Sequence, residues 1–287
     1  MMTILKHIRD LESHLTGYRK KGKKIGFVPT MGALHDGHMS LIRKSREQVD
    51  LTVCSIFVNP TQFNDPADYE KYPVTLSQDI RMLEQEGCDV LFLPTRVEIY
   101  PGGTNELKSY DLGFLETVYE GKYRPGHFQG VCQVVDILVS AVNPDLLYLG
   151  QKDYQQCMVI ARMLAITGRQ EIELQLCPTL REPNGLAMSS RNRRLSEEER
   201  QRAAVIQKGL QSVKAQIKPG DTRFLVNDIA DSLRQQGFQI DYFEVADAKT
   251  LAPVAVWNGK NDLVALAAVF LGEVRLIDNL VIPGSSS

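Results

Sequence analysis

The chain has 287 residues, of which 43% are hydrophobic and 24% charged, and its formal net charge is −2. This composition is that of an ordinary globular protein, its length suits one large domain or two smaller ones, and its near-neutral charge argues against nucleic-acid or membrane-surface binding. The five cysteines show no C-x-x-C spacing, so we expect buried free thiols in a reducing cytoplasm and no disulfide or metal set.

In the first half of the chain, apolar runs alternate with helical patterns. Residues 1–15 carry charges throughout and predict an amphipathic helix, not a signal peptide. We expect strands at 24–30, 51–60, 88–94, 145–150 and 171–179. Between them we expect helices at about 38–49, 75–87, 128–144 and 154–168, with Gly87 as a C-terminal cap. Apolar strands separated by helices predict a Rossmann-like α/β domain, with a parallel sheet covered on both faces.

After about residue 179 the pattern changes. Residues 181–195 are polar and basic, and Ser196 with Glu199 forms a capping-box signature. Two helical segments split by residues 218–221 precede strands at 239–248, 262–272 and 274–282, which predicts a smaller α+β domain. We place the boundary near residue 178, giving domains 1–178 and 179–287. The longest apolar run, at 263–272, is too short to span a bilayer, so we expect no membrane partner.

The stretch "VPTMGALHDGH", residues 28–38, joins the first of these strands to a helix and holds two of the five histidines. In open parallel sheets, ligands bind beyond the carboxyl ends of the strands. Gly32 and Gly37 would let the backbone approach a ligand closely. The helix that follows offers N–H groups and a partial positive charge, so the turn predicts an anion site, most naturally for phosphates.

Two known phosphate-binding motifs and a zinc site do not fit this turn. A P-loop needs Gly-Lys-Ser/Thr, whereas His38 follows Gly37. A dinucleotide fingerprint needs G-x-G-x-x-G and an acidic residue near the end of the second strand, where Asn59 stands instead. A zinc site needs a further ligand, and Asp36 alone makes a poor set.

The histidine pair itself favours a functional interpretation. A single histidine here would be read as a solvated loop residue or a helix cap. His35 and His38, three residues apart, share a helix face and can donate to phosphate oxygens. We expect them to act mainly as neutral donors, because the positive end of the helix disfavours an imidazolium.

The residues "HDGH" fit the H-x-G-H motif of the nucleotidylyltransferase superfamily, which includes class I aminoacyl-tRNA synthetases, and "LAMSSRN" resembles its second nucleotide-binding loop. A longer ordered set resembles the pantothenate synthetase (pantoate–β-alanine ligase) family: "VPTMGALHDGH", "SIFVNPTQF", "KYP", "IYPGGT", "RPGHFQGV", "GQKDYQQ" and "GLAMSSRNRRL". The match runs from residue 25 to about 195, with a weaker echo in "VRLIDN". One departure is Gln151, where the family carries Glu; the position is expected to contribute backbone, so the expected activity stands.

The resemblance implies ATP-dependent condensation of pantoate with β-alanine through a pantoyl-adenylate, with Mg²⁺, a homodimer and a C-terminal lid domain. The implied ATP-binding residues are Met31, Gly32, Ala33, Leu34, His35, Asp36, Gly37, His38, Gly150, Gln151, Lys152, Asp153, Leu180, Met188, Ser189, Ser190 and Arg191. The implied substrate-binding residues are Gln62, Gln156, Pro29, Met31, Tyr72, Glu120 and Arg124, with His127 as a further pocket residue. Asp79 is the candidate Mg²⁺ contact, although a solvated helix carboxylate is an equal alternative.

The residue types suit this chemistry. His35, His38, Lys152, Ser189, Ser190 and Arg191 supply cations and donors for a departing pyrophosphate and are the expected catalytic residues. Gln62 and Gln156 can bind pantoate by neutral hydrogen bonds without holding back its carboxylate as a nucleophile. For each of these residues alone, a solvated surface position is the alternative.

Two other functions share part of this pattern. A simple nucleotidylyltransferase would transfer AMP to a phosphate-bearing acceptor and needs no amine site. A regulatory module would bind ATP and release nothing. The histidine pair, Lys152 and the Ser-Ser-Arg segment together disfavour the second.

Overall fold

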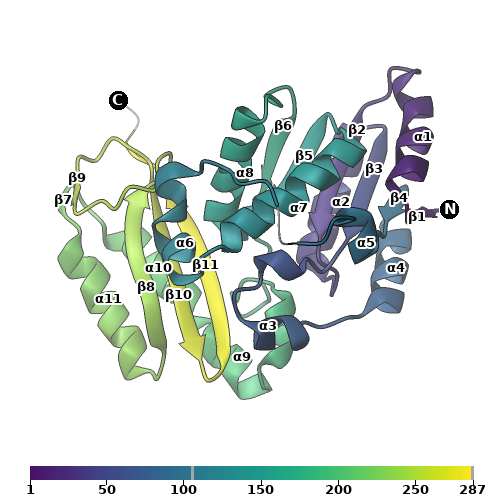
Figure 1. Ribbon diagram of the computed structural model, residues 1–287. Helices are drawn as coiled ribbons and strands as arrows, with labels where there is room; N and C mark the ends of the chain where they lie inside the picture. The colour runs from purple at the N-terminus through teal and green to yellow at the C-terminus, as the bar shows by residue number, and fades with distance from the viewer. Residues whose placement is uncertain (105–106, 286–287) are drawn as a thin grey trace. The chain divides into compact units, whose positions relative to one another are not determined.

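The computed structural model describes residues 1–104 and 107–285, and within it the chain divides into two compact units. Unit 1 comprises Met1–Gln151 and Gln155–Pro178, and unit 2 comprises Lys152–Tyr154 and the chain from Thr179 onward. Figure 1 shows the elements of both units in chain order.

Unit 1 is built on a six-stranded sheet in which every paired strand is parallel. In spatial order the strands are β1 (Thr3–Leu5), β4 (Val90–Phe92), β3 (Leu51–Ile56), β2 (Ile25–Thr30), β5 (Leu146–Gly150) and β6 (Glu173–Cys177). The central strands are buried on both faces, which is why they read as continuous apolar runs.

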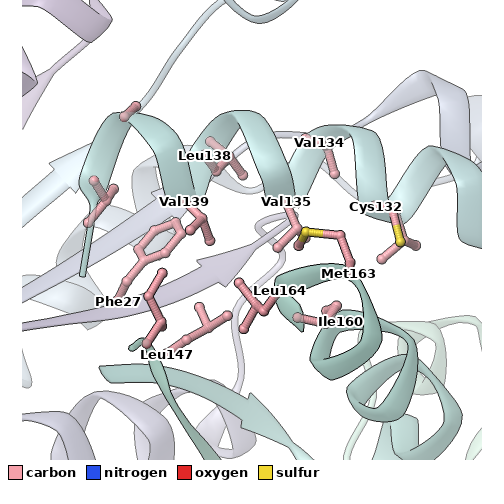
Figure 2. Close-up of a cluster of buried hydrophobic side chains, with 14 of the residues drawn as sticks. Phe27, Cys132, Val134, Val135, Leu138, Val139, Leu147, Ile160, Met163 and Leu164 are labelled. Atoms are coloured by element: carbon pink, nitrogen blue, oxygen red, sulfur yellow. The ribbon is translucent and has the colours of Figure 1, made fainter. Parts of the chain in front are cut away.

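Helices cover both faces of this sheet. The cores place α1 (Ile8–Arg19), α7 (His127–Val142) and α8 (Tyr154–Ile166) on one face, and α2 (Asp36–Gln48) and α4 (Leu76–Gln85) on the other. Neighbouring residues of β2 face opposite ways, with Phe27 in the first core and Val28 in the second. Figure 2 shows side chains of α7 and α8 meeting Phe27 and Leu147 of the sheet.

Short elements connect these segments at the carboxyl ends of the strands and between the helices. They are η1 (Pro60–Gln62), α3 (Pro66–Glu70), α5 (Arg96–Ile99), η2 (Gly113–Glu116), α6 (Tyr119–Tyr123) and η3 (Gln151–Asp153).

Unit 2 has a three-stranded antiparallel sheet, β11 (Val274–Ile282), β10 (Leu263–Leu271) and β8 (Gln239–Asp247), with β10 in the centre. Apolar residues of α10 (Val205–Gln216) and α11 (Arg223–Gln235) share one core with this sheet. The remaining elements are η4 (Ser190–Arg194), α9 (Glu197–Ala203) and the two-residue strands β7 (Gly220–Asp221) and β9 (Val256–Trp257).

Most sequence predictions for single elements are confirmed. Ser196 and Glu199 form a capping box at the start of α9, and Gly87 follows α4 with a φ of +73°. All five cysteines are buried and free. The prediction for residues 1–15 is wrong at its start, because Thr3–Leu5 pairs with β4 as an edge strand before α1 begins. Among the described residues, no helix combines the length and apolar character needed to cross a bilayer.

Candidate active site

The strand order of unit 1 reverses between β2 and β5. From β2 the chain proceeds to β3 and β4 on one side, whereas β5 leads to β6 on the other. The connections that leave the carboxyl ends of β2 and β5 therefore diverge, and open α/β sheets bind ligands at such a point. The sequence-predicted residues 31–38 follow β2, and Gly150, Gln151 and Gln156 lie at the end of β5 and just after it. Pro29 is the half-buried penultimate residue of β2.

The turn after β2 adopts an unusual backbone. Gly32 has a φ of +80°, and Ala33 has a φ of +49°, which an L-residue with a Cβ rarely adopts. The fully buried carboxylate of Asp79 accepts from the backbone N–H of Ala33 at 3.0 Å and of Leu34 at 2.9 Å. Thr75 donates its hydroxyl to the same carboxylate at 2.9 Å. Asp79 therefore holds a strained turn in place.

These contacts bear on the expected role of Asp79 in metal binding. Both of its oxygens already accept hydrogen bonds from the protein, so in the structure this carboxylate binds the turn. Within residues 1–104 and 107–285, no group of three or more His, Cys, Asp or Glu could hold a metal ion. A Mg²⁺ ion here would depend mainly on phosphate and water oxygens, as Mg²⁺ commonly does. Contact between Asp79 and Mg²⁺ stays a prediction.

The two histidines flank the first turn of α2. His35 is the extended N-cap residue and His38 is the third helical residue, with ring centroids 4.1 Å apart. The backbone N–H of His35 donates to Nδ1 of His38 at 3.3 Å. An Nδ1 that accepts carries no proton, so a neutral His38 has its proton on Nε2. Asp36 and Gly37 form the first turn between the two rings.

Gln62, the last residue of η1, lies beside this turn. Its side chain is largely buried, and its Nε2 is 3.0 Å from the sulfur of Met31. Two residues expected to bind substrate, from the segments after β2 and β3, are thus brought together.

Residues where α6 meets α7 hold the backbone of Gln62 in place. Nδ1 of His127 donates to the Gln62 carbonyl at 2.7 Å, and NH1 of Arg124 lies 3.2 Å from Nε2 of the same imidazole. Arg124 is also 3.6 Å from the buried carboxylate of Glu120. Tyr72, from the connection after η1, makes an edge contact with Phe63 at 5.7 Å between ring centroids.

The adjacent glutamines of α8 have different roles. Gln155 is buried; its Nε2 donates to the carbonyls of Leu115 and Val118, and its Oε1 accepts from the N–H of Glu120. Gln155 therefore holds the segment that carries Glu120. Sequence reasoning missed this role, for which an amide in an apolar helix is the only local sign. Gln156 is half-buried and stays the predicted ligand.

Within unit 2, the "VRLIDN" segment anchors two of the expected site segments. Asn279 of β11 donates to the carbonyl of Lys152 at 2.8 Å, and Asp278 accepts two bonds from Arg181, at 2.6 and 3.0 Å. Nζ of Lys152 lies 3.7 Å from Oδ1 of Asp153, which makes a long ion pair. In the sequence this segment shows only a weak similarity to the family. The buried polar residues Asp278 and Asn279 give the segment its structural role.

The Ser-Ser-Arg segment forms the start of η4. Ser189 is its N-cap and accepts from the N–H of Arg191 at 3.3 Å, while Ser190 is buried. The N–H of Met188 donates to the carbonyl of Leu180 at 3.0 Å, which joins two further residues of the expected ATP site. Asn192 holds the segment by donating to Glu182 and to the carbonyl of Ala187.

Comparison with known proteins identifies the family. The family model described as pantoate-beta-alanine ligase matches residues 3–281. A pantothenate synthetase of Bacteroides thetaiotaomicron is 44% identical over 285 residues, covering 97% of this chain and 98% of the relative. One from Pseudomonas fluorescens is 45% identical over 281 residues, covering 97% of both chains.

Solved structures agree in fold over nearly the whole chain. The crystal structure of pantothenate synthetase from Thermus thermophilus superposes with a TM-score of 0.88 at 37% identity, covering 97% of this chain and 99% of that one. The ligase from Francisella tularensis, described as complexed with beta-gamma ATP and beta-alanine, has a TM-score of 0.82 at 38% identity, with 98% of each chain covered. The chain therefore belongs to the pantoate–β-alanine ligase family, and it is an enzyme that ligates pantoate to β-alanine.

Proposed function

We propose that the enzyme uses ATP in two steps. The pantoate carboxylate attacks the α-phosphate and expels pyrophosphate, and the amine of β-alanine then attacks the pantoyl-adenylate and expels AMP. The single observation that carries this proposal is the histidine pair at the N-terminus of α2, which lies at the reversal of strand order beside Gln62. The nucleotide and β-alanine named for the Francisella structure support the same reaction.

In the first step, negative charge grows on the phosphates. Nε2–H of His38 donates to a phosphate oxygen, and the first turn of α2 adds its N–H groups and partial positive charge. The Asp79-bound turn fixes these donors beforehand, so they need no rearrangement as the reaction proceeds.

The leaving pyrophosphate needs cations and further donors. Lys152 supplies an ammonium and Arg191 a guanidinium, and Ser189 and Ser190 supply hydroxyls. Gly150, Gln151, Asp153, Leu180 and Met188 are further nucleotide-binding residues that the family resemblance implies. Mg²⁺, when bound, supplies charge neutralisation between the phosphates.

Pantoate lies against Gln62 and Gln156, with Pro29, Met31 and Tyr72 around it. Glu120 and Arg124 complete that part of the site. The neutral amides of the two glutamines bind the oxygens of pantoate without competing for the charge that makes its carboxylate a nucleophile.

A pyrophosphate-exchange assay tests this order. Labelled pyrophosphate should enter ATP when pantoate and Mg²⁺ are present and β-alanine is absent. Exchange that requires β-alanine, or that proceeds without pantoate, would rule out the adenylate route.

We further propose that the enzyme works in the cytoplasm as a homodimer, as the family resemblance implies. Sedimentation equilibrium should give twice the chain mass of 32.2 kDa. A single species at the chain mass would contradict the dimer and leave the reaction untouched.

A further inference from the structure

The amide of Asn59, just after β3, is enclosed by hydrogen-bond partners. Its side chain is 1% exposed. The phenol of Tyr100 donates to its Oδ1 at 2.8 Å, and the hydroxyl of Thr61 donates to the same oxygen at 3.1 Å. Its Nδ2 donates to the carbonyl of Gly130 at 3.0 Å and to Oε1 of Gln62 at 3.2 Å.

These partners determine which way round the Asn59 amide lies. The carbonyl of Gly130 can only accept, so the atom facing it must be the NH₂ group. The phenol of Tyr100 then faces the oxygen. Burial raises the pKa of Tyr100, so the phenol keeps its proton and remains a donor.

The orientation of Asn59 in turn determines that of Gln62. The Gln62 atom that faces Nδ2 of Asn59 must be an acceptor, which makes it Oε1. Nε2 is therefore turned toward the 31–38 segment, where its neighbour is the Met31 sulfur, only a weak acceptor. Gln62 presents N–H groups on that side, and not its oxygen.

The backbone under this network leaves little room to shift. A Cβ at Gly130 would lie 2.3 Å from the carbonyl oxygen of Thr61, so η1 lies directly against α7. His127 holds the carbonyl of Gln62 as well. The Gln62 side chain therefore starts from a fixed backbone and has one amide orientation that satisfies Asn59.

We propose that Tyr100 is a positioning residue which, together with the Gly130 carbonyl, secures Asn59 and through it holds the Gln62 amide with Nε2 toward the substrate, where an acceptor oxygen of pantoate binds. The inference rests on the proposed function in one respect, the contact between Gln62 and pantoate. Asn59 uses both N–H groups and its oxygen within the protein, so it acts through Gln62 and not on the substrate.

Tyr100→Phe tests the proposal by removing only the phenolic oxygen. Without that donor the oxygen of Asn59 is held by Thr61 alone, while Gly130 still accepts from its Nδ2. Asn59 is then held less firmly, and so is the Gln62 amide that it orients. The KM for pantoate should rise about 3- to 10-fold, the effect of one hydrogen bond, with the KM for ATP unchanged. Tyr110→Phe is the matched control, because Tyr110 is equally buried and donates its phenol to Asp136 at 2.6 Å, outside this network. It should lower thermal stability and leave the pantoate KM as it is.

A double-mutant cycle separates positioning from a general structural effect. Gln62→Ala should raise the pantoate KM, and adding Tyr100→Phe to it should produce no further rise, because the two residues act through one contact. Gln62→Glu keeps an oxygen for Asn59 but places a carboxylate oxygen where Nε2 stood. Its pantoate KM should exceed that of Gln62→Ala at neutral pH, and the gap should close on acidification as a protonated Glu restores a donor.

The outcomes distinguish the inference from the proposed function. If Tyr100→Phe changes the pantoate KM no more than Tyr110→Phe, or changes it equally with and without Gln62, the positioning role is wrong and the proposed reaction stands. If Gln62→Ala itself leaves the pantoate KM unchanged, the contact between Gln62 and pantoate is wrong, and this inference falls with it.

Discussion

His38 gains its chemistry from its neighbours at the start of α2. With Nδ1 engaged by the N–H of His35, Nε2–H is the group that it can offer to a phosphate oxygen. His38→Ala should slow adenylation by about 10²- to 10³-fold, the usual loss for one preorganised donor. Single-turnover pyrophosphate release measures this rate.

The matched control is His14→Ala on α1, which removes an equally sized ring from a helix away from the turn. It should leave the adenylation rate unchanged. A His38→Ala enzyme that adenylates at nearly the full rate would show that its imidazole is no donor to the transition state.

Asp79→Asn tests whether this carboxylate serves the turn or the metal. An amide can accept from only one of the Ala33 and Leu34 N–H groups and turns its own NH₂ toward the other. Two opposed donors in a buried place should cost about 1–3 kcal/mol of stability. Adenylation should slow as the turn relaxes, and excess Mg²⁺ should not restore it.

Titration of the variant with Mg²⁺ is the decisive measurement. If high Mg²⁺ fully restored the adenylation rate and the thermal stability were unchanged, Asp79 would contact the metal and the turn would not depend on it.

At the scale of elements, the contact of η1 with α7 controls the place of Gln62. Gly130→Ala would put a methyl group 2.3 Å from the Thr61 carbonyl oxygen, so η1 must move. We expect the pantoate KM to rise and thermal stability to fall. Gly17→Ala is the control, because a Cβ there meets nothing within 4 Å in α1 and should stabilise the enzyme by about 0.5–1 kcal/mol. If the two substitutions changed the pantoate KM and the thermal stability equally, the packing of η1 against α7 would not control the position of Gln62.

A second link between elements predicts a pH dependence of stability. Asp136 of α7 accepts from Tyr110, Lys108 and Arg169. Burial raises the pKa of Asp136, but these three hydrogen bonds outweigh it and hold the pKa below its ordinary value. The stabilisation is thus present above the unfolded-state pKa of about 4 and is lost as the pH falls through the lower folded value.

Urea unfolding across that acidic range checks this. The wild type should lose more stability on acidification than Asp136→Asn, which cannot titrate. Parallel losses in the two proteins would show that this carboxylate does not link α7 to its neighbours.

Elements could be predicted from the sequence wherever they form a continuous apolar run or a helical period. The buried strands β2 to β5 and the helices between them satisfy that condition, and the histidine turn follows from its place between β2 and α2. The three-residue strand β1 does not, because its pairing with β4 comes from distant sequence and its charged neighbours resemble a helix.

The hydrogen-bond partners of buried polar side chains could not be predicted from the sequence, for a related reason. Asp79, Asn59 and Gln155 act by hydrogen bonds to segments 35 to 71 residues away. No local pattern indicates such a pairing, so the sequence alone does not predict that Asp79 binds the turn or that Gln155 holds the segment of Glu120. Composition shows that an amide is present, and only the fold shows which atoms it faces.

At the scale of the whole molecule, the proposed reaction relies on the placement of substrates more than on reactive groups of the protein. Its thiols are buried, and burial raises the pKa of Cys54, Cys88 and Cys132, so they are poor nucleophiles. The residues expected at the site are imidazoles, amides, hydroxyls and cations that hold charge and orient substrates. An enzyme of this kind should form its covalent intermediate between its substrates and not on the protein.

The order of chemistry can be read from where an oxygen atom goes. In an adenylate route, an oxygen of the pantoate carboxylate attacks the α-phosphorus and stays bound to it when β-alanine takes the acyl carbon. Pantoate labelled with heavy oxygen in its carboxylate should therefore deliver one label to each AMP, which mass spectrometry of the nucleotide detects. Transfer of the γ-phosphate would instead give ADP and labelled inorganic phosphate. The site favours the first, because His35 and His38 lie at the turn that the inner phosphates would approach, and no P-loop lysine follows Gly37 to organise γ-transfer. ADP as product, or label in phosphate and none in AMP, would remove the proposed roles of both histidines and of Lys152 together.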